Sequence, residues 1–405
     1  MTQANKAVVV GGSLGGLFAA NLLLRAGWDV HVYERVADAM EGRGAGIVTH
    51  PELLAALGEA GVTVNDSFGV KVQERVTLGQ DGTRVGSRVF PQTLTAWAHL
   101  HHLLRAAFPN QRYHCGKHLV AFSQDARGAS ATFADGEAVA GDILIAADGV
   151  RSSVRQSLLP AAKPLYAGYV AWRGLVEEAA LSAAALKDVF PYFAFGLPPH
   201  EQMIAYPVAG SNNAVEPGQR RYNFVWYRRA DEATTLRDML TDADGRAWLD
   251  GIPPPLIRAG VLAQARQAAR AVLAPQFAEV VQKTESLLFQ PIFDLESPQL
   301  AFGRIALLGD AAFVARPHCG MGVTKAAGDA IVLVKALQQT GDAVAALKAY
   351  ELPRLELGRQ VVGHARALGA YMQAQIRTAR EREMAERYRT PAAVMDETAV
   401  PLAMM

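Results

Sequence analysis

A glycine-rich turn near the amino end of the sequence has the composition of a phosphate-binding loop. Gly11-Gly12-Ser13-Leu14-Gly15-Gly16 follows an apolar stretch and precedes a helical pattern. Gly11 would make the tight turn, Gly16 would let the helix pack on the strand, and the small Ser13 leaves room for a pyrophosphate at the helix N-terminus. Glu34 ends the next strand, at the spacing from which a carboxylate binds a ribose. These residues predict a dinucleotide site; the alternative is a tight turn with a surface glutamate.

Two further motifs carry carboxylates at the ends of apolar strands. Asp148-Gly149 follows the apolar stretch 141–147, and Gly309-Asp310 follows 304–308. The carboxyl ends of parallel strands face the ligand crevice of an open α/β sheet. Glycines in the stretch Arg316-Pro317-His318-Cys319-Gly320-Met321-Gly322, just before a helical pattern, would add backbone amides to a ligand site. Each dipeptide alone is an ordinary turn, so it is their placement at strand ends that indicates a site.

A scaffold of alternating strands and helices must position these motifs. Apolar patterning predicts a βαβ unit of strand 7–11, helix 17–26 and strand 29–33. A region with β-like segments then interrupts this lobe before a buried strand, 304–309, returns to it. The further elements expected are helix 97–108, strands 118–123, 129–133, 141–147, 168–175, 202–208 and 222–227, and helices over 324–339 and 342–388. We therefore predict an α/β protein with a Rossmann-like nucleotide lobe, an interleaved antiparallel-sheet substrate lobe and C-terminal helices.

The two lobes are expected to interleave along the chain. Residues 1–165 form the first part of the nucleotide lobe, with an excursion into the substrate lobe near 70–95. Residues 166–295 form the substrate-binding lobe, 296–350 the second part of the nucleotide lobe, and 351–405 a C-terminal helical segment. The C-terminal helices could pack on the chain's own lobes or form the interface of a homodimer.

Composition narrows the class of protein. The chain has 405 residues, half of them hydrophobic, with a formal net charge of +1 and 2 cysteines. This composition excludes intrinsic disorder, and the balanced charge gives no reason to expect a nucleic-acid partner. Two distant thiols fit a cytoplasmic protein, no apolar run is long enough to cross a membrane, and no metal-ligand spacing is present. The histidines at 99, 101 and 102 have no acidic neighbour in sequence, so we interpret them as non-metal.

In order and spacing the three motifs resemble the FAD-dependent aromatic hydroxylases, single-component monooxygenases of the p-hydroxybenzoate hydroxylase fold. The resemblance extends from residue 7 to about 350. Four stretches are most similar to the members that hydroxylate dihydroxypyridines: 44–53 (GAGIVTHPEL), 166–174 (YAGYVAWRG), 204–210 (IAYPVAG) and 309–318 (GDAAFVARPH).

The resemblance implies a bound FAD and a transient NADH or NADPH, and it assigns cofactor contacts along the chain. Ser13, Leu14, Gly15 and Gly16 would hold the pyrophosphate, with Gly11 at the turn before them. Glu34 would bind the adenosine ribose, with Arg35 and Leu119 near the adenine. Asp148 would take part in binding both FAD and the nicotinamide cofactor, and Asp310 would contact the ribityl or pyrophosphate region of FAD. Val48, Pro317, Gly320, Met321 and Gly322 would border the isoalloxazine ring.

The sequence departs from the family pattern at four positions. The middle glycine of the glycine-rich turn is replaced by Ser13. Phe313 stands where many relatives have histidine, and Thr324 where many have asparagine. Trp97 replaces an arginine that reaches the pyrophosphate in relatives. The expected hydrogen bonds to FAD therefore differ in detail from the family pattern.

The reaction implied by the resemblance is O₂-dependent ring hydroxylation through a flavin C4a-hydroperoxide. The protein would position the ring, exclude water and help deprotonate a ring hydroxyl, for which histidine is a suitable base. His50 follows the flavin-side loop and His318 lies in the Arg-Pro-His segment, so both are candidate catalytic residues. The alternatives are a helix-capping His50 and a structural His318.

Candidate substrate contacts lie on strands of the second lobe and beside the third motif. Tyr206, Trp172 and Tyr222 could stack on a heteroaromatic ring, although ordinary sheet core is the alternative for each. Arg316 or Arg173 could bind a substrate anion. We expect a small aromatic substrate and O₂, with a hydroxypyridine such as 2,6-dihydroxypyridine favoured. The alternatives are a carboxylated ring of the hydroxynicotinate or salicylate type, and an FAD protein without hydroxylase activity.

Overall fold

The computed structural model describes residues 4–37, 46–249, 251–373 and 376–401. Its first lobe is built on a six-stranded sheet that is parallel except at one edge. Its strands, in spatial order, are β16 (Ala301–Phe302), β17 (Ile305–Leu307), β10 (Ile143–Ala146), β1 (Lys6–Val10), β2 (Asp29–Tyr33) and β6 (Tyr113–His114). Strands β1 and β10 are buried along almost their whole length, as expected for parallel strands covered on both faces.

Helices cover one face of this sheet and a small sheet covers the other. Helix α1 (Leu14–Arg25) packs against α9 (Gly322–Gln339), and α3 (Trp97–Ala106) lies beside α1. The opposite face carries a three-stranded antiparallel sheet of β7 (Leu119–Gln124), β8 (Ala129–Phe133) and β9 (Ala138–Gly141). Short helices α2 (Pro51–Glu59) and α4 (Ser153–Leu158) complete the lobe, whose core is one continuous apolar cluster.

The second lobe is built on a nine-stranded, mostly antiparallel sheet. Its strands, in spatial order, are β18 (Phe313–Val314), β15 (Leu288–Glu296), β11 (Leu165–Glu177), β14 (Arg221–Arg229), β13 (Gln202–Val208), β12 (Phe193–Gly196), β4 (Val70–Leu78), β5 (Arg84–Ala96) and β3 (Gly46–Val48). The β4–β5 hairpin comes from the amino-terminal third of the chain and joins the sheet through a parallel pairing of β4 with β12.

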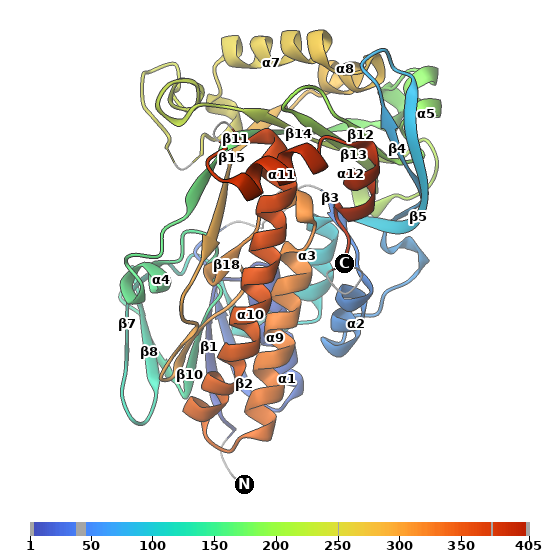
Figure 1. The fold of residues 1–405 in the computed structure, drawn as a ribbon. Helices are drawn as coiled ribbons and strands as arrows, with labels where there is room; N and C mark the ends of the chain where they lie inside the picture. The colour runs from blue at the N-terminus through green and yellow to red at the C-terminus, as the bar shows by residue number, and fades with distance from the viewer. Residues whose placement is uncertain (1–3, 38–45, 250, 374–375, 402–405) are drawn as a thin grey trace.

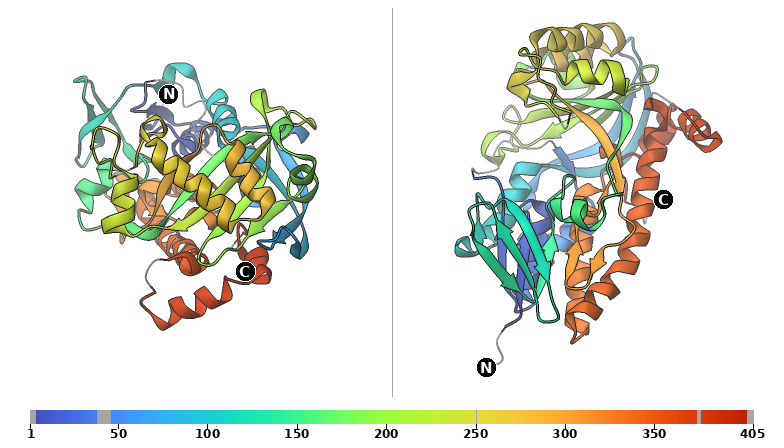
Figure 2. Two further views of the ribbon diagram at one scale, coloured as in Figure 1. Left: turned by 90° about the horizontal axis from the view of Figure 1, so that it is seen from above. Right: turned by 90° about the vertical axis from the view of Figure 1, so that its left-hand side faces the viewer.

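The two faces of the nine-stranded sheet bury different apolar clusters. The outer face packs beneath α7 (Ala259–Val272) and α8 (Pro275–Lys283), with α5 (Ala183–Asp188) and α6 (Arg237–Met239) nearby. The inner face turns toward the first lobe and buries a third cluster, together with residues of α10 and of the C-terminal region. Figures 1 and 2 show this sheet above the six-stranded sheet, with α7 and α8 on its outer side.

The C-terminal helices pack on the chain itself. Helix α10 (Ala343–Gly369) runs alongside α9 and reaches strands of both sheets, so it connects the two lobes along one side (Figures 1 and 2). Helix α11 (Ala379–Arg387) contacts α10, and α12 (Pro391–Glu397) packs on β4 and β5. The α/β architecture with interleaved parallel and antiparallel sheets and C-terminal helices is confirmed.

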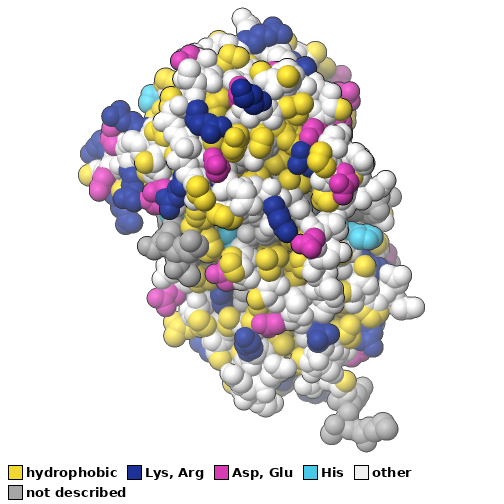
Figure 3. All heavy atoms as spheres, turned by 90° about the vertical axis from the view of Figure 1, so that its right-hand side faces the viewer, with side chains coloured by type: hydrophobic (Ala, Val, Ile, Leu, Met, Phe, Trp, Pro, Cys, Tyr) yellow, Lys and Arg dark blue, Asp and Glu magenta, His cyan; other side chains and the backbone are white. Residues whose placement is uncertain are grey.

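The surface carries no strong bias of charge on the face drawn in Figure 3, where basic and acidic side chains are interspersed. Helix α11 is rich in both signs and mostly exposed. No described helix has the length and apolar character that a bilayer span requires. The described residues also contain no group of three or more histidine, cysteine or acidic side chains placed to hold a metal ion.

Candidate active site

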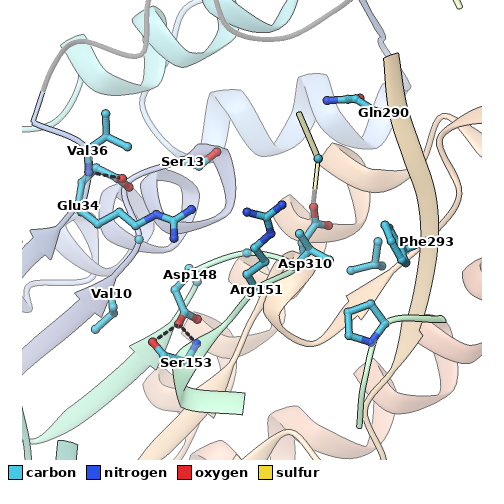
Figure 4. A pocket seen from close by; sticks show the side chains of 18 of the residues that line it. Val10, Ser13, Glu34, Val36, Asp148, Arg151, Ser153, Gln290, Phe293 and Asp310 are labelled. Atoms are coloured by element: carbon cyan, nitrogen blue, oxygen red, sulfur yellow. Dashed lines mark hydrogen bonds between the residues drawn. The ribbon is translucent and has the colours of Figure 1, made fainter. Parts of the chain in front are cut away.

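A cavity of about 1010 Å³ lies between the two lobes. One wall is formed by the carboxyl ends of β1, β2 and β10 and by the loop around Asp310. The facing wall is the stretch 289–293 of β15, from which Gln290 and Phe293 approach (Figure 4). The lining of the cavity includes Leu119, Pro317 and residues of the glycine-rich turn, the Asp-Gly motif and the Gly-Asp motif. It therefore joins the three sequence motifs in one site.

The glycine-rich turn is shaped by contacts that exclude side chains. Gly11 has φ +103°, and a Cβ there would lie 2.3 Å from the carbonyl oxygen of Ala147 on the neighbouring strand. A Cβ at Gly16 would lie 1.9 Å from the carbonyl oxygen of Gly11. Ser13 caps α1 but its side chain makes no capping hydrogen bond, and it lines the cavity (Figure 4). Leu14, Gly15 and Gly16 form the first turn of α1 behind it, so the backbone amides of a helix N-terminus open on this part of the cavity.

Glu34 joins the glycine-rich turn to the end of β2. Its carboxylate accepts a hydrogen bond from the backbone N–H of Gly12 at 2.7 Å and from that of Val36 at 2.9 Å (Figure 4). The carbonyl oxygen of Gly12 accepts in turn from the Tyr113 hydroxyl at 3.0 Å. Glu34, Arg35 and Leu119 all line the same end of the cavity, where the adenosine part of a dinucleotide was predicted.

The Asp-Gly motif lies at the end of β10. One carboxylate oxygen of Asp148 accepts from the backbone N–H of Ser153 at 2.9 Å and from its hydroxyl, while the other is buried without a hydrogen-bond partner in the described structure (Figure 4). Burial raises the pKa of Asp148. Arg155 then ties this motif to the Gly-Asp motif, because it donates to the carbonyl oxygens of Val150 at 2.6 Å and Ala311 at 3.1 Å.

A buried charged network holds the Gly-Asp motif. Asp329 of α9 accepts from the backbone N–H of Gly309 at 3.0 Å, from Lys325 at 3.1 Å and from Arg354 of α10 at 2.6 Å. Lys325 also donates to the carbonyl oxygen of Gly309 at 2.9 Å. Both backbone groups of Gly309 are therefore fixed. The next residue, Asp310, points its carboxylate into the cavity (Figure 4), and burial raises its pKa.

The residues predicted to border the flavin ring lie in the loop before α9 and on β3. Pro317 lines the cavity, and Gly320 has φ +67° and begins the turn into α9 at Gly322. Val48 on β3 pairs with Leu94 of β5, and it shares a buried cluster with Met321. The Tyr206 hydroxyl donates to the carbonyl oxygen of Gly46 at 2.9 Å, which fixes the start of β3. Residues 44 and 45 of the stretch 44–53 lie outside the described residues.

The two candidate histidines have different surroundings. His50 is 1% exposed, its Nδ1 lies 2.9 Å from the hydroxyl of Thr324 at the start of α9, and its Nε2 has no hydrogen-bond partner in the described structure. Burial lowers the pKa of His50. His318 is held by the carbonyl oxygen of Ala365 at 2.9 Å and packs on Tyr169 and Tyr227.

His318 does not have the properties of the predicted catalytic base. Burial lowers the pKa of His318 to about 3, so its imidazole is neutral and a very weak base near pH 7. Its Nε2 is occupied by the contact with α10. The structural interpretation of His318 is therefore favoured, and His50 is the remaining candidate.

Three predicted substrate contacts need correction. Trp172 and Tyr222 lie on the outer face of the nine-stranded sheet, in the apolar cluster under α7 and α8, because strand alternation points them away from the first lobe. Arg316 is buried and forms an ion pair with Asp294 at 2.8 Å, with a further hydrogen bond to Gln373. Tyr206 remains on the inner face.

Several cavity residues were not predicted from the sequence. Tyr33 and Trp97 line the cavity near Glu34, and Arg151 points into it beside Asp310 (Figure 4). Arg151 stands three residues after Asp148 at a predicted strand end, so its position was available from the sequence. The wall formed by β15 had no such signal, because its contact with the nucleotide lobe is made only by folding.

Comparison with known proteins places the chain in a family. It is 33% identical over 374 residues to 2,6-dihydroxypyridine 3-monooxygenase of Paenarthrobacter nicotinovorans, which covers 91% of this chain and 92% of that protein. The chain belongs to the FAD-dependent aromatic hydroxylases. A family model described as FAD binding domain-like matches residues 166–294 of this hydroxylase.

Solved structures agree with this assignment. The structure of 2,6-dihydroxypyridine-3-hydroxylase from Arthrobacter nicotinovorans superposes on this hydroxylase with a TM-score of 0.86, at 32% identity over 92% of this chain and 93% of that one. A structure of a variant of HpxO from Klebsiella pneumoniae, complexed with FAD, has a TM-score of 0.77 at 25% identity, over 97% of this chain and 95% of that one. A further relative, 6-hydroxynicotinate 3-monooxygenase of Bordetella bronchiseptica, is 28% identical over 87% of this chain and 88% of that protein.

The cavity of this hydroxylase fits FAD. Two positions in the glycine-rich turn have no room for a Cβ, the first turn of α1 offers backbone amides for a pyrophosphate, and Glu34 stands at the end of β2. Asp148 has a buried oxygen without a partner in the described structure, and Asp310 opens into the cavity. These residues would hold the cofactor from adenosine to ribityl chain, with Pro317 at the ring end.

Proposed function

We propose that this hydroxylase uses NADH or NADPH and O₂ to hydroxylate a small hydroxylated pyridine, such as 2,6-dihydroxypyridine. The substrate class is supported by the similarity to 2,6-dihydroxypyridine 3-monooxygenase along nearly the whole of both chains. The observation that carries the mechanism is His50, a buried neutral imidazole beside the loop that would border the flavin ring.

The bound FAD would supply the reduction and activation of O₂. The chain's own residues would hold the substrate ring and keep water away from it. The inner face of the nine-stranded sheet offers an apolar, aromatic surface for this purpose, with Tyr206 and Tyr227 among its buried side chains. Such a surface can bind a flat heteroaromatic ring and exclude water at the same time.

His50 would accept the proton of a ring hydroxyl. Because burial lowers its pKa, His50 is neutral at pH 7 and can accept a proton. The hydroxyl of Thr324 holds Nδ1 and thereby fixes the orientation of the ring. Loss of the hydroxyl proton increases the electron density of the substrate ring, which favours its attack on activated oxygen.

A carboxylated ring is the second candidate, and Arg173 favours it. This residue lies on β11 between Trp172 and Gly174, so strand alternation directs it to the inner face. Its Nε is buried without a hydrogen-bond partner in the described structure, and its positive charge opposes the rise in pKa of Tyr206 and of Tyr227. An arginine at that place would pair with a ring carboxylate of the hydroxynicotinate or salicylate type.

A panel of ring compounds tests the proposal and separates the two candidates. Purified protein should be yellow, and dihydroxypyridines should stimulate NADH or NADPH oxidation, O₂ uptake and formation of a product heavier by one oxygen. A response only to ring carboxylates would favour the second candidate. Oxidation without a hydroxylated product from any hydroxypyridine would contradict the first, and protein unable to bind FAD would contradict both.

A further inference from the structure

A short segment after α12 is buried against the loop that precedes α9. Thr398, Ala399 and Val400, which we call the C-terminal segment, are each at most 3% exposed. Figure 1 shows the chain reaching this point beside β3, far in sequence from the loops around it. Burial of irregular backbone needs hydrogen-bond partners, so the contacts of this segment indicate what it does.

Ala399 lies directly against the loop that would border the flavin ring. Its backbone N–H donates to the carbonyl oxygen of His318 at 3.1 Å. A Cβ added to Gly320 would lie 2.8 Å from the Cβ of Ala399, so only glycine leaves room there. The backbone of Ala399 also opposes the lowering of the pKa of His50, which places it beside the candidate base. The segment therefore contacts both the ring-side loop and His50.

The backbone of Ala399 is in a strained conformation. Its φ is +53°, in the left-handed region that non-glycine residues rarely adopt. Such a conformation persists only where the surroundings impose it, and it is most often found at functional sites. The contacts of the segment must therefore compensate for this cost.

Arg75 on β4 supplies those contacts. It donates to the backbone carbonyl oxygens of Met395 at 2.6 Å, Thr398 at 2.8 Å and Ala399 at 3.2 Å, and to the side-chain oxygen of Gln92 at 2.7 and 3.0 Å. Gln92 on β5 donates to the carbonyl oxygen of Ala399 as well, at 3.2 Å. All the hydrogen-bonding capacity of the guanidinium is directed at the segment, at Met395 of α12 and at Gln92.

Burial of the Arg75 guanidinium has a high free-energy cost, which a purely structural role would not explain. Its side chain is fully buried between the rings of Phe90 and Phe193, and no ion pair involves it in the part of the chain that the structure describes. Burial lowers the pKa of Arg75 to about 9. A buried cation without a counter-ion is destabilising unless hydrogen bonds compensate for it, and here neutral carbonyl and amide oxygens do so.

We propose that the C-terminal segment is a wall of the substrate chamber and that Arg75 is the positioning residue that holds it against His50 and the ring-side loop. The wall would exclude water from the flavin ring and limit the size of the substrate. This inference rests on the proposed ring hydroxylation, but the exclusion of solvent from a bound flavin can be measured without any substrate.

Two variants remove the wall in different ways. A chain that ends at Glu397 lacks the segment. Arg75→Met keeps the segment but removes the hydrogen bonds by which Arg75 holds it. Arg84→Met is the matched control, because Arg84 lies on the same hairpin but is exposed and stacks on Tyr192. Arg75→Lys keeps a cation that can donate to some of the carbonyls, so it should restore part of the function.

The first measurement is quenching of bound-flavin fluorescence by iodide, with no substrate present. We expect the quenching constant to rise several-fold in both wall variants and to stay unchanged in Arg84→Met, with FAD still bound. The second is turnover with the ring substrate that the panel identifies. Its KM should rise roughly tenfold, as for the loss of one hydrogen bond to a charged group, and more of the reducing equivalents should go to peroxide.

Each outcome decides the proposal. Unchanged quenching in the chain that ends at Glu397 would show that the segment is no wall. Loss of FAD from that chain would also overturn the proposal, since the segment would then belong to the cofactor site. If Arg75→Met lowered only the thermal stability, with quenching and peroxide formation as in the parent, Arg75 would be merely structural. If no ring in the panel is hydroxylated, the quenching result still stands and only the proposed substrate is wrong.

Discussion

The ammonium group of Lys325 lies 2.9 Å from the carbonyl oxygen of Gly309, the residue that precedes Asp310. Lys325 is 2% exposed, and its other hydrogen bond goes to Asp329, which binds the N–H of the same glycine. Side chains of helix α9 therefore fix, through these hydrogen bonds, the backbone of the residue that precedes Asp310. The position of that cavity-facing carboxylate is set by charged side chains that do not line the cavity.

Substitution of Asp329 should therefore loosen the cofactor site and the fold together. Asp329→Asn leaves Lys325 and Arg354 buried without their carboxylate, and breaking a buried ion pair in this way costs about 3–5 kcal/mol. We expect a lower urea midpoint and weaker FAD binding. The control Asp66→Asn, at an exposed ion pair, should change neither. An unchanged FAD affinity in Asp329→Asn would contradict a positioning role.

Removal of the cofactor-facing carboxylate should affect FAD without affecting the fold. In Asp310→Ala the network around Gly309 stays intact, and an acceptor that faces the predicted ribityl chain is lost. We expect FAD affinity to fall by roughly tenfold or more, as for a hydrogen bond with a charged partner. Fluorescence titration of the apoprotein with FAD measures this. Retention of FAD through purification at the parental level would argue against the assignment.

The tight turn at the start of α1 should not accept even a methyl group. In Gly16→Ala the new Cβ would lie 1.9 Å from the carbonyl oxygen of Gly11, so the turn must shift. We expect a loss of about 1–3 kcal/mol in the free energy of unfolding, with weaker FAD binding. Gly260→Ala is a suitable control, because a Cβ there meets nothing within 4 Å. Equal urea midpoints for the two variants would show that the turn tolerates the methyl group.

His50 should determine the pH at which kcat/KM falls on the acid side of the pH profile. Because burial lowers its pKa, the neutral form persists below pH 6.5, and kcat/KM of the parent should fall only at lower pH as His50 gains a proton. His50→Ala should keep FAD yet slow hydroxylation, most at the lower end of the range from pH 6 to 9, where the ring hydroxyl is least ionised and His50 of the parent can still accept its proton. Turnover of His50→Ala equal to the parent from pH 6 to 9 would exclude His50 as the base. The exposed His102→Ala is the control.

His318 should make the fold sensitive to acid. Its pKa is lowered from 6.5 to about 3 in the folded protein, so the unfolded chain takes up the proton first as the pH falls. The stability that His318 contributes is complete above pH 6.5 and is lost between pH 6.5 and about 3, by at most about 1.4 kcal/mol per pH unit. In His318→Gln the dependence of the urea midpoint on pH should be shallower over this window. A slope identical to the parent's would be inconsistent with the buried neutral imidazole.

Sequence reasoning located the elements that depend on local patterns. Strand 29–33 and strand 202–208 were predicted with the bounds of β2 and β13, and the predicted helix 324–339 begins two residues late relative to α9. The stretch 342–388, predicted as helical, forms two separate helices, α10 and α11. The pattern of polar and apolar residues along this stretch does not show where the first helix ends. The predicted strand 141–147 is likewise divided between β9, which ends at Gly141, and β10, which begins at Ile143.

The sequence by itself placed the residues predicted to contact the cofactor in their local elements. The glycines at 11 and 16, Glu34, Asp148 and Asp310 stand at strand ends and helix starts, and such positions follow from short-range patterns of apolar residues and turns. Periodicity could not decide which face of the second sheet Trp172 and Tyr222 occupy, because the side chains of a strand alternate whatever lies on either side.

Only the tertiary structure decided the ring side. His50, Arg75, Gly320 and Ala399 are separated by up to hundreds of positions. They meet because β3, the β4–β5 hairpin, the loop before α9 and the segment after α12 lie beside one another in the fold. Burial there makes a histidine a neutral acceptor and leaves an arginine dependent on backbone carbonyls. These properties arise from desolvation in the folded protein, which no local pattern in the sequence records.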